Sequence, residues 1–574
     1  NLFFIYLTIK ETFRSEILQN NDKIGFRNFQ DYQKRKTMFT TAFLEEELAQ
    51  IAVRGAFQRQ NLKSMELRVM PQKNDIENIR MIRIYDEAIA NKKNWDCEKN
   101  SIHEKCGICK RDKRNKKDKW QKKLYKKYYY VIHFGKKEDN IKGNGAYGCR
   151  HWEFRKTVKQ RSMAIMSMRE KNPNIAGRLK GIDACSSEDG CRPEVFAVAF
   201  RELKAHEVYR TDTKQNLSAL RISYHVGEEN QDILDGLRAI DEAVYFLNLE
   251  SGDRLGHATM LGINVEKWYR RNQHMISIRQ HDYLDNVAWL YHRIVYYHIS
   301  NQDNLLEYLE HEFQVYFNRI YEQHMSNSFN MGILGKKEGH LKHDLNFNIH
   351  NYYYAWELRG DDPELYAEGF YQKSHQQGTS WGDQAINRRV QAERREIPEA
   401  AILYYTYHYN EKVRKEGEKP IAIKIPYYMM CGIAMVQKNM QRRIAKCGIA
   451  IETNPSSNLL IAGLAGYESH PILSFYNKGL VGDPAQIEEC PQINVSINTD
   501  DQGTFTTSLY NEYTMMAGSL ENLRGEDGEH IYKKDRVYDW INNVRKMGNK
   551  QAFSKEVPEE HRLGEGRNND LKKD

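Results

Sequence analysis

The sequence predicts an α/β fold, a (β/α)8 TIM-like barrel with large, mainly helical insertions. The chain has 574 residues, enough for the roughly 250 residues of such a barrel and for substantial additions. Several short apolar segments end in His, Glu or Asp, and barrels of this kind carry their chemistry at the carboxyl ends of their strands. Between these segments apolar residues recur at helical spacing, as in Met429, Ile433, Val436, Met440 and Ile444.

Seven strands are predicted, at 64–70, 128–134, 179–185, 220–225, 253–257, 448–453 and 493–499. The first strand of an eight-stranded barrel has no counterpart, and the chain opens at Asn1 in a segment typical of the helix after that strand. We therefore expect residues 1–74 to be the start of a barrel whose first strand precedes Asn1. The barrel continues through 126–264 and 426–520, and C-terminal helices with a polar tail follow at 521–574.

A first insertion, at 75–125, is rich in cysteine and lysine. Three thiols and one imidazole in it are candidate ligands of a structural zinc: Cys97, His103, Cys106 and Cys109. Cys149 is an alternative fourth ligand, and reduced surface cysteines are the other interpretation. The basic run from Lys110 to Lys127, with interleaved aromatic residues, is compatible with phosphate binding but is more typical of a solvated face.

A second insertion, at 265–425, is predicted to be mainly helical because apolar residues recur at helical spacing in Leu305, Leu309, Phe313, Phe317 and Ile320. It is rich in tyrosine, which suits subunit interfaces as well as packing on the barrel. Because it enters from the active-site face, it is also a candidate lid or nucleotide-tail pocket.

Composition narrows the class of protein. Nine cysteines, an odd number, argue against a secreted disulfide framework and favour a reducing cytoplasm. The longest apolar run, 426–436, is shorter than the roughly 20 residues that span a bilayer, and residues 1–9 lack the features of a signal peptide. The net charge of +8 permits an anionic substrate without requiring nucleic-acid binding. No G-x-S-x-G or Walker motif is present.

The strand ends carry the residues of a metal-dependent reaction. His225 ends the strand at 220–225 and Glu228 follows it, His257 ends the strand at 253–257, and Asp500 with Asp501 follows the strand at 493–499. Imidazole and carboxylate together are the ligand set of a catalytic zinc. Paired carboxylates at a buried strand end are costly unless a metal or a substrate compensates them.

These segments resemble the adenosine/AMP deaminase family. Five motifs occur in the family's order: His225-Val226-Gly227-Glu228, Arg254-Leu255-Gly256-His257, Glu452 to Asn458, His470-Pro471 and Asn498-Thr499-Asp500-Asp501. Upstream, Ser64 to Pro71 is similar to the family's second strand and Gly181-Ile182-Asp183 to its fourth. The family's first strand supplies two zinc ligands in a His-x-His pair that this sequence lacks, so we expect that pair upstream of Asn1. The alternative is a metal-free relative that only binds.

The resemblance implies a role for each matched residue. His225 and Asp500 would hold one catalytic Zn²⁺ together with the two histidines of the absent strand. Glu228 would donate a proton to N1 of adenine, and His257 would orient or deprotonate the attacking water. Asp501 would contact N7 in its protonated form, since N7 is an acceptor. Ser186 stands where the family has a glycine that lines the purine edge.

Within the family, the chain is most similar to the large bacterial deaminase subunit of RADAR phage-defence systems. The similarity lies in 242–247, in 252–258 and in the long second insertion. It implies an adenine nucleotide substrate such as ATP, a homo-oligomeric shell and an AAA+ ATPase partner. Two alternatives stay open: a non-catalytic shell or binding protein on a decayed deaminase barrel, and an RNA-acting adenosine deaminase.

Overall fold

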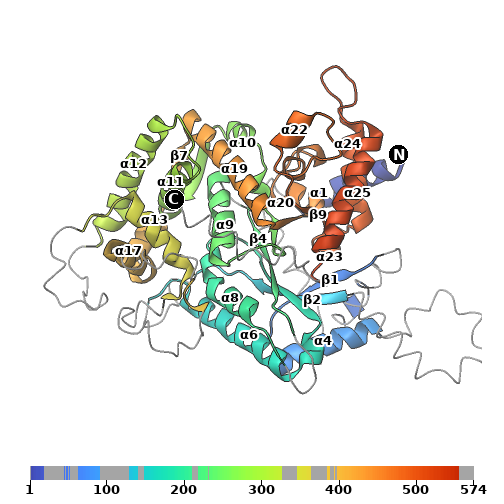
Figure 1. Ribbon diagram of the computed structural model, residues 1–574, viewed down its shortest axis with the longest axis horizontal. Helices are drawn as coiled ribbons and strands as arrows, with labels where there is room; N and C mark the ends of the chain where they lie inside the picture. The colour runs from blue at the N-terminus through green and yellow to red at the C-terminus, as the bar shows by residue number, and fades with distance from the viewer. Residues whose placement is uncertain are drawn as a thin grey trace, which may run out of the picture.

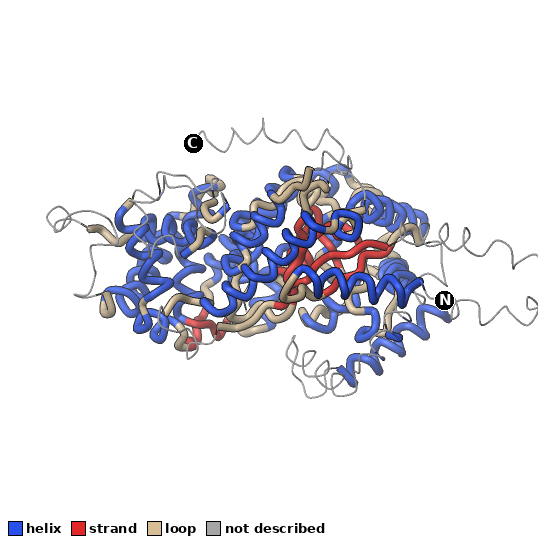
Figure 2. The backbone as a smooth tube through the Cα atoms, turned by 90° about the horizontal axis from the view of Figure 1, so that it is seen from below, coloured by secondary structure: helices blue, strands red, loops and turns tan. Residues whose placement is uncertain are grey.

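The computed structural model describes residues 2–18, 62–90, 128–139, 148–209, 217–229, 232–325, 345–363, 384–387 and 397–554, with a few single residues between them. Strands lie in the middle of the molecule and helices surround them (Figures 1 and 2). The cysteine cluster Cys97, His103, Cys106 and Cys109, the basic run and the polar tail lie outside the described residues. Cys149, the alternative ligand, is fully buried.

The central sheet has seven parallel strands that follow one another in chain order. They are β1 (Met65–Val69), β2 (Tyr128–Gly135), β3 (Leu179–Cys185), β4 (Arg221–Val226), β5 (Arg254–His257), β8 (Ala450–Thr453) and β9 (Val495–Ile497). All seven predicted strands are therefore confirmed. The sheet is curled like part of a barrel, and within the described ranges β1 and β9 do not pair with each other, so closure of the barrel is not observed.

Helices connect the strands, as expected of a parallel sheet. Their bounds are α4 (Asp75–Ala90), α6 (Trp152–Lys171), α8 (Ala197–Ala205), α9 (Ile233–Phe246), α19 (Tyr427–Cys447) and α20 (Pro455–Ile461). The predicted apolar face of α19 is confirmed, because Met429, Ile433 and Val436 are buried. This helix ends at Gly448, whose φ of 68° is a left-handed conformation that glycine adopts without strain.

The second insertion is mainly helical in its described part, on the side of the molecule labelled α12, α13 and α17 in Figure 1. Its helices are α10 (Val265–Arg271), α11 (Gln280–Tyr296), α12 (Asp303–Phe317), α13 (Ile349–Glu357), α17 (Pro398–Tyr409) and α18 (Glu411–Gly417). The predicted apolar stripe from Leu305 to Ile320 is buried. An unpredicted antiparallel pair, β6 (Met275–Arg279) and β7 (Pro420–Lys424), brings the two ends of the insertion together.

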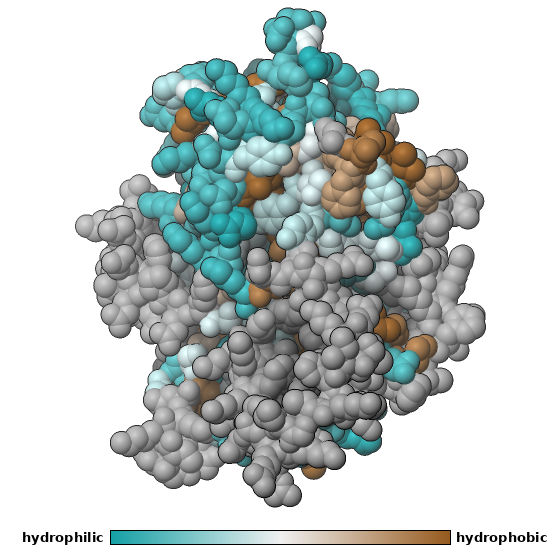
Figure 3. Space-filling model, turned by 90° about the vertical axis from the view of Figure 1, so that its right-hand side faces the viewer, coloured by the Kyte–Doolittle hydropathy of each residue, from teal (hydrophilic) through white to brown (hydrophobic). Residues whose placement is uncertain are grey.

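The C-terminal region packs beside the sheet. It comprises α22 (Pro484–Glu489), α23 (Gln502–Phe505), α24 (Leu509–Asn522) and α25 (Lys534–Gln551). The first helix, α1 (Leu2–Leu18), packs on α24, where Phe4 lies against Gly518, and Leu7 of the same helix is buried. Its opposite face exposes Leu2, Ile9 and Phe13. Figure 3 views this side of the molecule, and among the residues coloured in it a group of hydrophobic side chains lies beside hydrophilic ones.

The amino ends of the strands are covered by Phe553, which follows α25. Its ring centroid lies 3.6 Å from the guanidinium carbon of Arg254 at the start of β5. A Cβ atom on Gly181 would lie 2.5 Å from the Phe553 ring, so this strand position requires glycine. Residues 551–554 therefore close one end of the sheet interior, and the opposite end, where His225 and His257 lie, remains available for chemistry.

The interior of the sheet is charged and not purely apolar. Arg254 pairs with Glu66 and Glu452, each at 2.7 Å, and Arg68 pairs with Glu452 and Asp183, each at 2.6 Å. Because Asp183, Arg254 and Glu452 are buried and Arg68 and Glu66 are partly buried, these charges need their partners to offset the cost of desolvation. This series of ion pairs extends from the amino ends of the strands to Asp183, which lies close to the predicted site.

Within the described ranges, none of the helices has both the length and the apolar character needed to cross a bilayer.

Candidate active site

The carboxyl ends of the strands bring three of the predicted site residues together. His225 is on β4, His257 ends β5, and Asp500 lies in the turn after β9. One potential ligand atom from each of these residues lies within 4.8 Å of the others. A second group with the same spacing consists of His133, Asp183 and His225. The described residues thus offer two overlapping sets of metal donors, which share His225.

The His225 imidazole is held by a buried carboxylate. Its Nδ1 lies 2.9 Å from Oδ1 of Asp183, a residue with no exposed surface. Burial lowers the pKa of His225, although Asp183 opposes this shift, so the imidazole is neutral as a metal ligand must be. Burial alone would raise the pKa of Asp183, but His225, Arg68 and His133 together hold it well below the usual value.

The His257 imidazole is held in a similar way by Glu228. Its Nδ1 lies 2.8 Å from Oε1 of Glu228, and His257 is only 1% exposed. Burial alone would lower the pKa of His257, but Glu228 raises it to about 9. At neutral pH the His257 imidazole is therefore protonated where it faces the Glu228 carboxylate. His257 also has a left-handed φ of 62°, a strained conformation of the kind found at functional sites.

The predicted motif at 452–458 supports Glu228. In α20, the Ser457 hydroxyl and the Asn458 amide lie 3.2 and 3.4 Å from Oε1 of Glu228. Asn458 also lies 3.1 Å from Nε2 of His470, the histidine of the predicted His-Pro motif. Burial, with the nearby His257, lowers the pKa of His470 to about 3, so this imidazole is neutral.

Glu188 is a site residue that the sequence interpretation did not identify. Its carboxylate accepts hydrogen bonds from the backbone N–H groups of Gly227 and Glu228, at 2.8 and 2.9 Å. Gly227 has a φ of 72°, and a Cβ there would lie 2.7 Å from Ile240, so the turn requires glycine. The only sequence signal was a carboxylate shortly after the end of the strand at 179–185.

His133 and Asp183 were also not identified as site residues. They occupy paired positions on β2 and β3, and His133 Nδ1 lies 2.7 Å from Oδ2 of Asp183. Burial alone would lower the pKa of His133, but Cys185 and Asp183 raise it to about 10. Side chains alternate between the two faces of a sheet along each strand, and this places His133 and Asp183 on the same face as His225. The alternation is the sequence signal that could have identified them.

The remaining predicted site residues also lie at the carboxyl ends of the strands. Asp500 is exposed and has a left-handed φ of 51°. The Asp501 carboxylate caps α23, accepting from the backbone N–H and the hydroxyl of Thr504 at 3.0 and 2.6 Å. Ser186, with a φ of 74°, adopts the left-handed conformation that glycine prefers. This agrees with its place at a position where the resembled family has glycine.

The donor set fits a metal ion. Two imidazoles and a carboxylate suit a divalent transition metal, whereas Mg²⁺ and Ca²⁺ prefer oxygen ligands alone. Each imidazole has a buried carboxylate on its Nδ1, the arrangement that orients metal-binding histidines. His225 and Asp500 are therefore the residues that would hold the ion, and His257 lies within 4.8 Å of both.

Glu512 on α24 is a buried acid that fixes the start of α20. Its Oε2 accepts the backbone N–H of Ser456 at 3.0 Å, and burial raises its pKa from 4.5 to about 7. The folded state therefore holds a proton that the unfolded state releases between these values, so stability is expected to fall as the pH rises from about 5 to 7. Glu512→Gln stays neutral and should lose this dependence, gaining up to about 3 kcal/mol over the native chain at pH 8.

Urea unfolding at pH 5 and pH 8 measures this difference. Glu526→Gln, at an exposed position, is the matched control and should leave the pH dependence as it is. An equal loss of stability between pH 5 and pH 8 in native chain and Glu512→Gln would contradict the assignment of Glu512 as the titrating group.

Comparisons with known proteins give partial similarities. No family model matches the chain. It is 34% identical over 97 residues to an adenosine deaminase of Plasmodium gallinaceum, covering 17% of this chain and 23% of that protein. It is 29% identical over 93 residues to an adenine deaminase of Sinorhizobium medicae (strain WSM419), covering 16% and 25%. The chain thus matches about a quarter of each relative's length.

Proposed function

We propose that this protein catalyses the zinc-dependent hydrolytic deamination of an adenine nucleoside or nucleotide, releasing ammonia and the inosine product. The observation that carries the proposal is the convergence of His225, His257 and Asp500 with Glu228 at the carboxyl ends of the strands. The partial similarity to adenosine and adenine deaminases supports the same reaction.

His225 and Asp500 would hold a zinc ion, which would supply an acidified water as the nucleophile for C6 of adenine. The protein's own part is proton transfer and orientation. Glu228 and His257 share a proton across 2.8 Å, and Glu228 passes it to N1 of the purine. His257 orients the water and takes its proton, which returns the pair to its starting state.

The residues at the carboxyl ends of the strands orient the substrate. Asp501 contacts N7 after its carboxylate leaves the Thr504 hydroxyl, and Ser186 lines the purine edge. Glu188 keeps the Gly227-Glu228 turn in place while Glu228 changes its protonation state, because its two hydrogen bonds go to the backbone. Positioning of this kind lowers the barrier by holding reacting groups within hydrogen-bonding reach.

The wider role we propose is anti-phage defence. The resemblance to the RADAR deaminase subunit supports a preference for a phosphorylated adenine such as ATP. It also supports a homo-oligomer with contacts in the 265–425 insertion, and an AAA+ ATPase partner.

The proposed reaction is tested by incubating the zinc-loaded protein with adenosine, AMP and ATP in turn. Loss of adenine absorbance with equimolar ammonia release is expected from at least one of them, and it should stop after treatment with a chelator. Asp500→Ala should remove metal and activity together. Absence of turnover with all three substrates, in a preparation shown to contain zinc, would refute the proposal.

A further inference from the structure

We propose that the junction between the start of α6 and the insertion helix α17 binds an oxyanion of the phosphate class, through Arg150, His151, Arg155 and His408. None of these four residues belongs to the candidate active site. The inference goes beyond the proposed function and does not depend on it, because phosphate binding can be measured without turnover.

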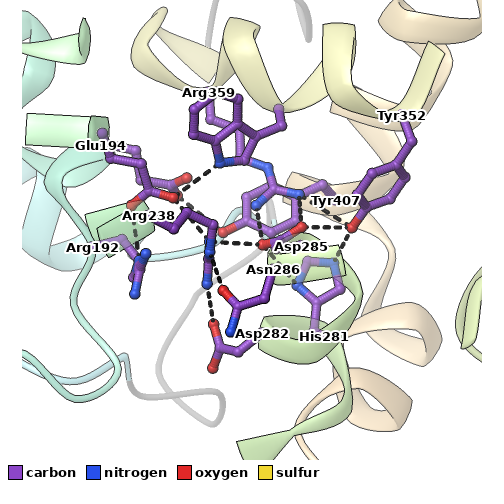
Figure 4. Close-up of polar contacts among 12 residues, drawn as sticks. Arg192, Glu194, Arg238, His281, Asp282, Asp285, Asn286, Tyr352, Arg359 and Tyr407 are labelled. Atoms are coloured by element: carbon purple, nitrogen blue, oxygen red, sulfur yellow. Dashed lines mark hydrogen bonds and ion pairs between the residues drawn. The ribbon is translucent and has the colours of Figure 1, made fainter. Parts of the chain in front are cut away.

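Hydrogen bonds and ring contacts join the start of α6 to α17. The backbone N–H of Arg150 donates to the carbonyl of His408 at 2.9 Å, and Nε of Arg150 donates to the carbonyl of Tyr407 at 2.7 Å. The guanidinium carbon of Arg150 lies 4.3 Å from the centre of the Tyr407 ring. That of Arg359 lies 3.7 Å from the same centre (Figure 4). The junction therefore gathers cationic side chains beside His408.

Two buried imidazoles at this junction have ring nitrogens without a partner. His408 is 1% exposed, and neither of its ring nitrogens has a hydrogen-bond partner among the described residues. His151 is 7% exposed, and within the same part of the chain its Nδ1 has none either. An imidazole always carries at least one N–H donor, and a buried donor without an acceptor is costly. A bound group that supplies acceptors would remove this cost.

The surrounding charge is positive. Nη2 of Arg150 and Nε of Arg155 are also buried without a hydrogen-bond partner in the described ranges. Burial lowers the pKa of His408 well below its usual value, and the cationic Arg155, Arg359 and Arg150 lower it further. Burial lowers the pKa of His151 in the same way, with added lowering by nearby arginines. Cations that keep two imidazoles neutral create the potential that attracts an anion.

The amino end of α6 points to the same class of ligand. This helix has 20 residues, and its N-cap residue, His151, makes no side-chain capping hydrogen bond. The amino end of a helix carries partial positive charge and N–H groups suited to a phosphate. His151 also has a left-handed φ of 57°, a strained conformation of the kind found at functional sites.

The nearby carboxylates are engaged with other atoms of these residues. Oε1 of Glu194 lies 3.2 Å from Nη2 of Arg155, and Oε1 of Glu418 lies 3.5 Å from Nη1 of Arg150. Asp139 accepts a backbone N–H at 3.0 Å. These contacts leave the four side chains with nitrogens that still need an acceptor. Phosphate offers several acceptor oxygens at once, which suits a set of guanidinium and imidazole donors.

Inorganic phosphate alone is the probe that tests the site. The full chain is freed of metal with a chelator, so that phosphate cannot bind to a metal ion, and is titrated calorimetrically in a low-chloride buffer. We expect one phosphate per chain, with a Kd below about 1 mM. His408→Phe and Arg150→Met should each weaken binding by about tenfold or more, because each removes donors from a desolvated anion. His311→Phe, at an exposed position on α12, is the matched control and should keep the native affinity.

His408→Phe keeps an aromatic ring of similar size and removes only the unsatisfied nitrogens, so it is expected to fold. Circular dichroism checks the folding of every variant. Native phosphate affinity in folded His408→Phe or Arg150→Met would overturn the inference. A native chain that binds no phosphate up to about 10 mM would overturn it whatever the variants do.

Repeating the titration with adenosine or ATP present identifies the source of the anion. If ATP displaces phosphate and adenosine does not, the site takes the phosphate tail of a nucleotide. If phosphate binds equally well in the presence of ATP, the site takes free phosphate; either result supports the site. Phosphate binding that depends on His408, in a protein with no deaminase turnover, would refute the proposed function alone.

Discussion

Replacing Arg238 with methionine is expected to lower the free energy of unfolding by about 4 kcal/mol. Arg238 lies on α9, has no exposed surface, and reaches toward α11 of the insertion (Figure 4). Its guanidinium contacts four carboxylates and one amide, within 2.7 to 3.1 Å: Asp235, Glu242, Asp282, Asp285 and Asn286. One side chain therefore joins the barrel to the insertion.

The size of the effect follows from the charges that would remain. Arg192, Arg279 and Arg359 also belong to this network, and each pairs with a carboxylate that Arg238 contacts. Without Arg238, three guanidinium groups would face four carboxylates, and among these the side chains of Glu242 and Asp285 are each only 2% exposed. Burial alone would raise the pKa of Asp285, and Arg359, His281 and Arg238 together reverse that shift. Methionine fills similar space, so the loss measured is electrostatic.

Equilibrium unfolding in urea, followed by tryptophan fluorescence, measures the difference. Arg270→Met is the matched control, since Arg270 pairs with Glu266 on the same helix face and both side chains are more than half exposed. That change should alter stability by less than about 1 kcal/mol. Equal effects of the two substitutions would show that the Arg238 network does not stabilise the fold.

Much of the strand layout could be predicted from the sequence, because each parallel strand is a short apolar run with a polar residue at its end. His225 and His257 were placed in this way, and the structure brings them together. The amphipathic period of α12 and α19 likewise predicted which residues are buried. These features depend on neighbouring positions in the chain, which is why periodicity reveals them.

Other features depend on residues far apart in the chain. Arg68 meets Glu452 and Asp183 only after the sheet has curled. Glu188 lies three residues beyond the end of β3, and nothing in its local sequence shows that it binds a backbone turn after the next strand. The β6–β7 pair joins two five-residue segments at opposite ends of the insertion, so its alternation is too short to stand out.

Glu228→Gln is expected to lower the turnover rate of deamination by about 10³-fold while the protein keeps its metal. Glutamine preserves the size of the side chain and can still accept the His257 Nδ1–H with its amide oxygen, so the imidazole stays oriented. It has no carboxylic proton to give to N1 of the purine. The turnover number should therefore fall with little change in KM, because the lost interaction belongs to the transition state.

Steady-state kinetics with the substrate that the native protein turns over best, alongside metal analysis of the same samples, tests this expectation. Glu229→Gln is the matched control: it makes the same chemical change one residue away, where Oε2 accepts the Ser187 hydroxyl at 2.9 Å. That variant should stay within a few-fold of the native rate. If Glu228→Gln kept the native rate, Glu228 would not be the acid, and the shared proton would belong to His257 alone. If Glu228→Gln lost metal as completely as Asp500→Ala, the fall in turnover would result from loss of the metal and not from loss of proton transfer.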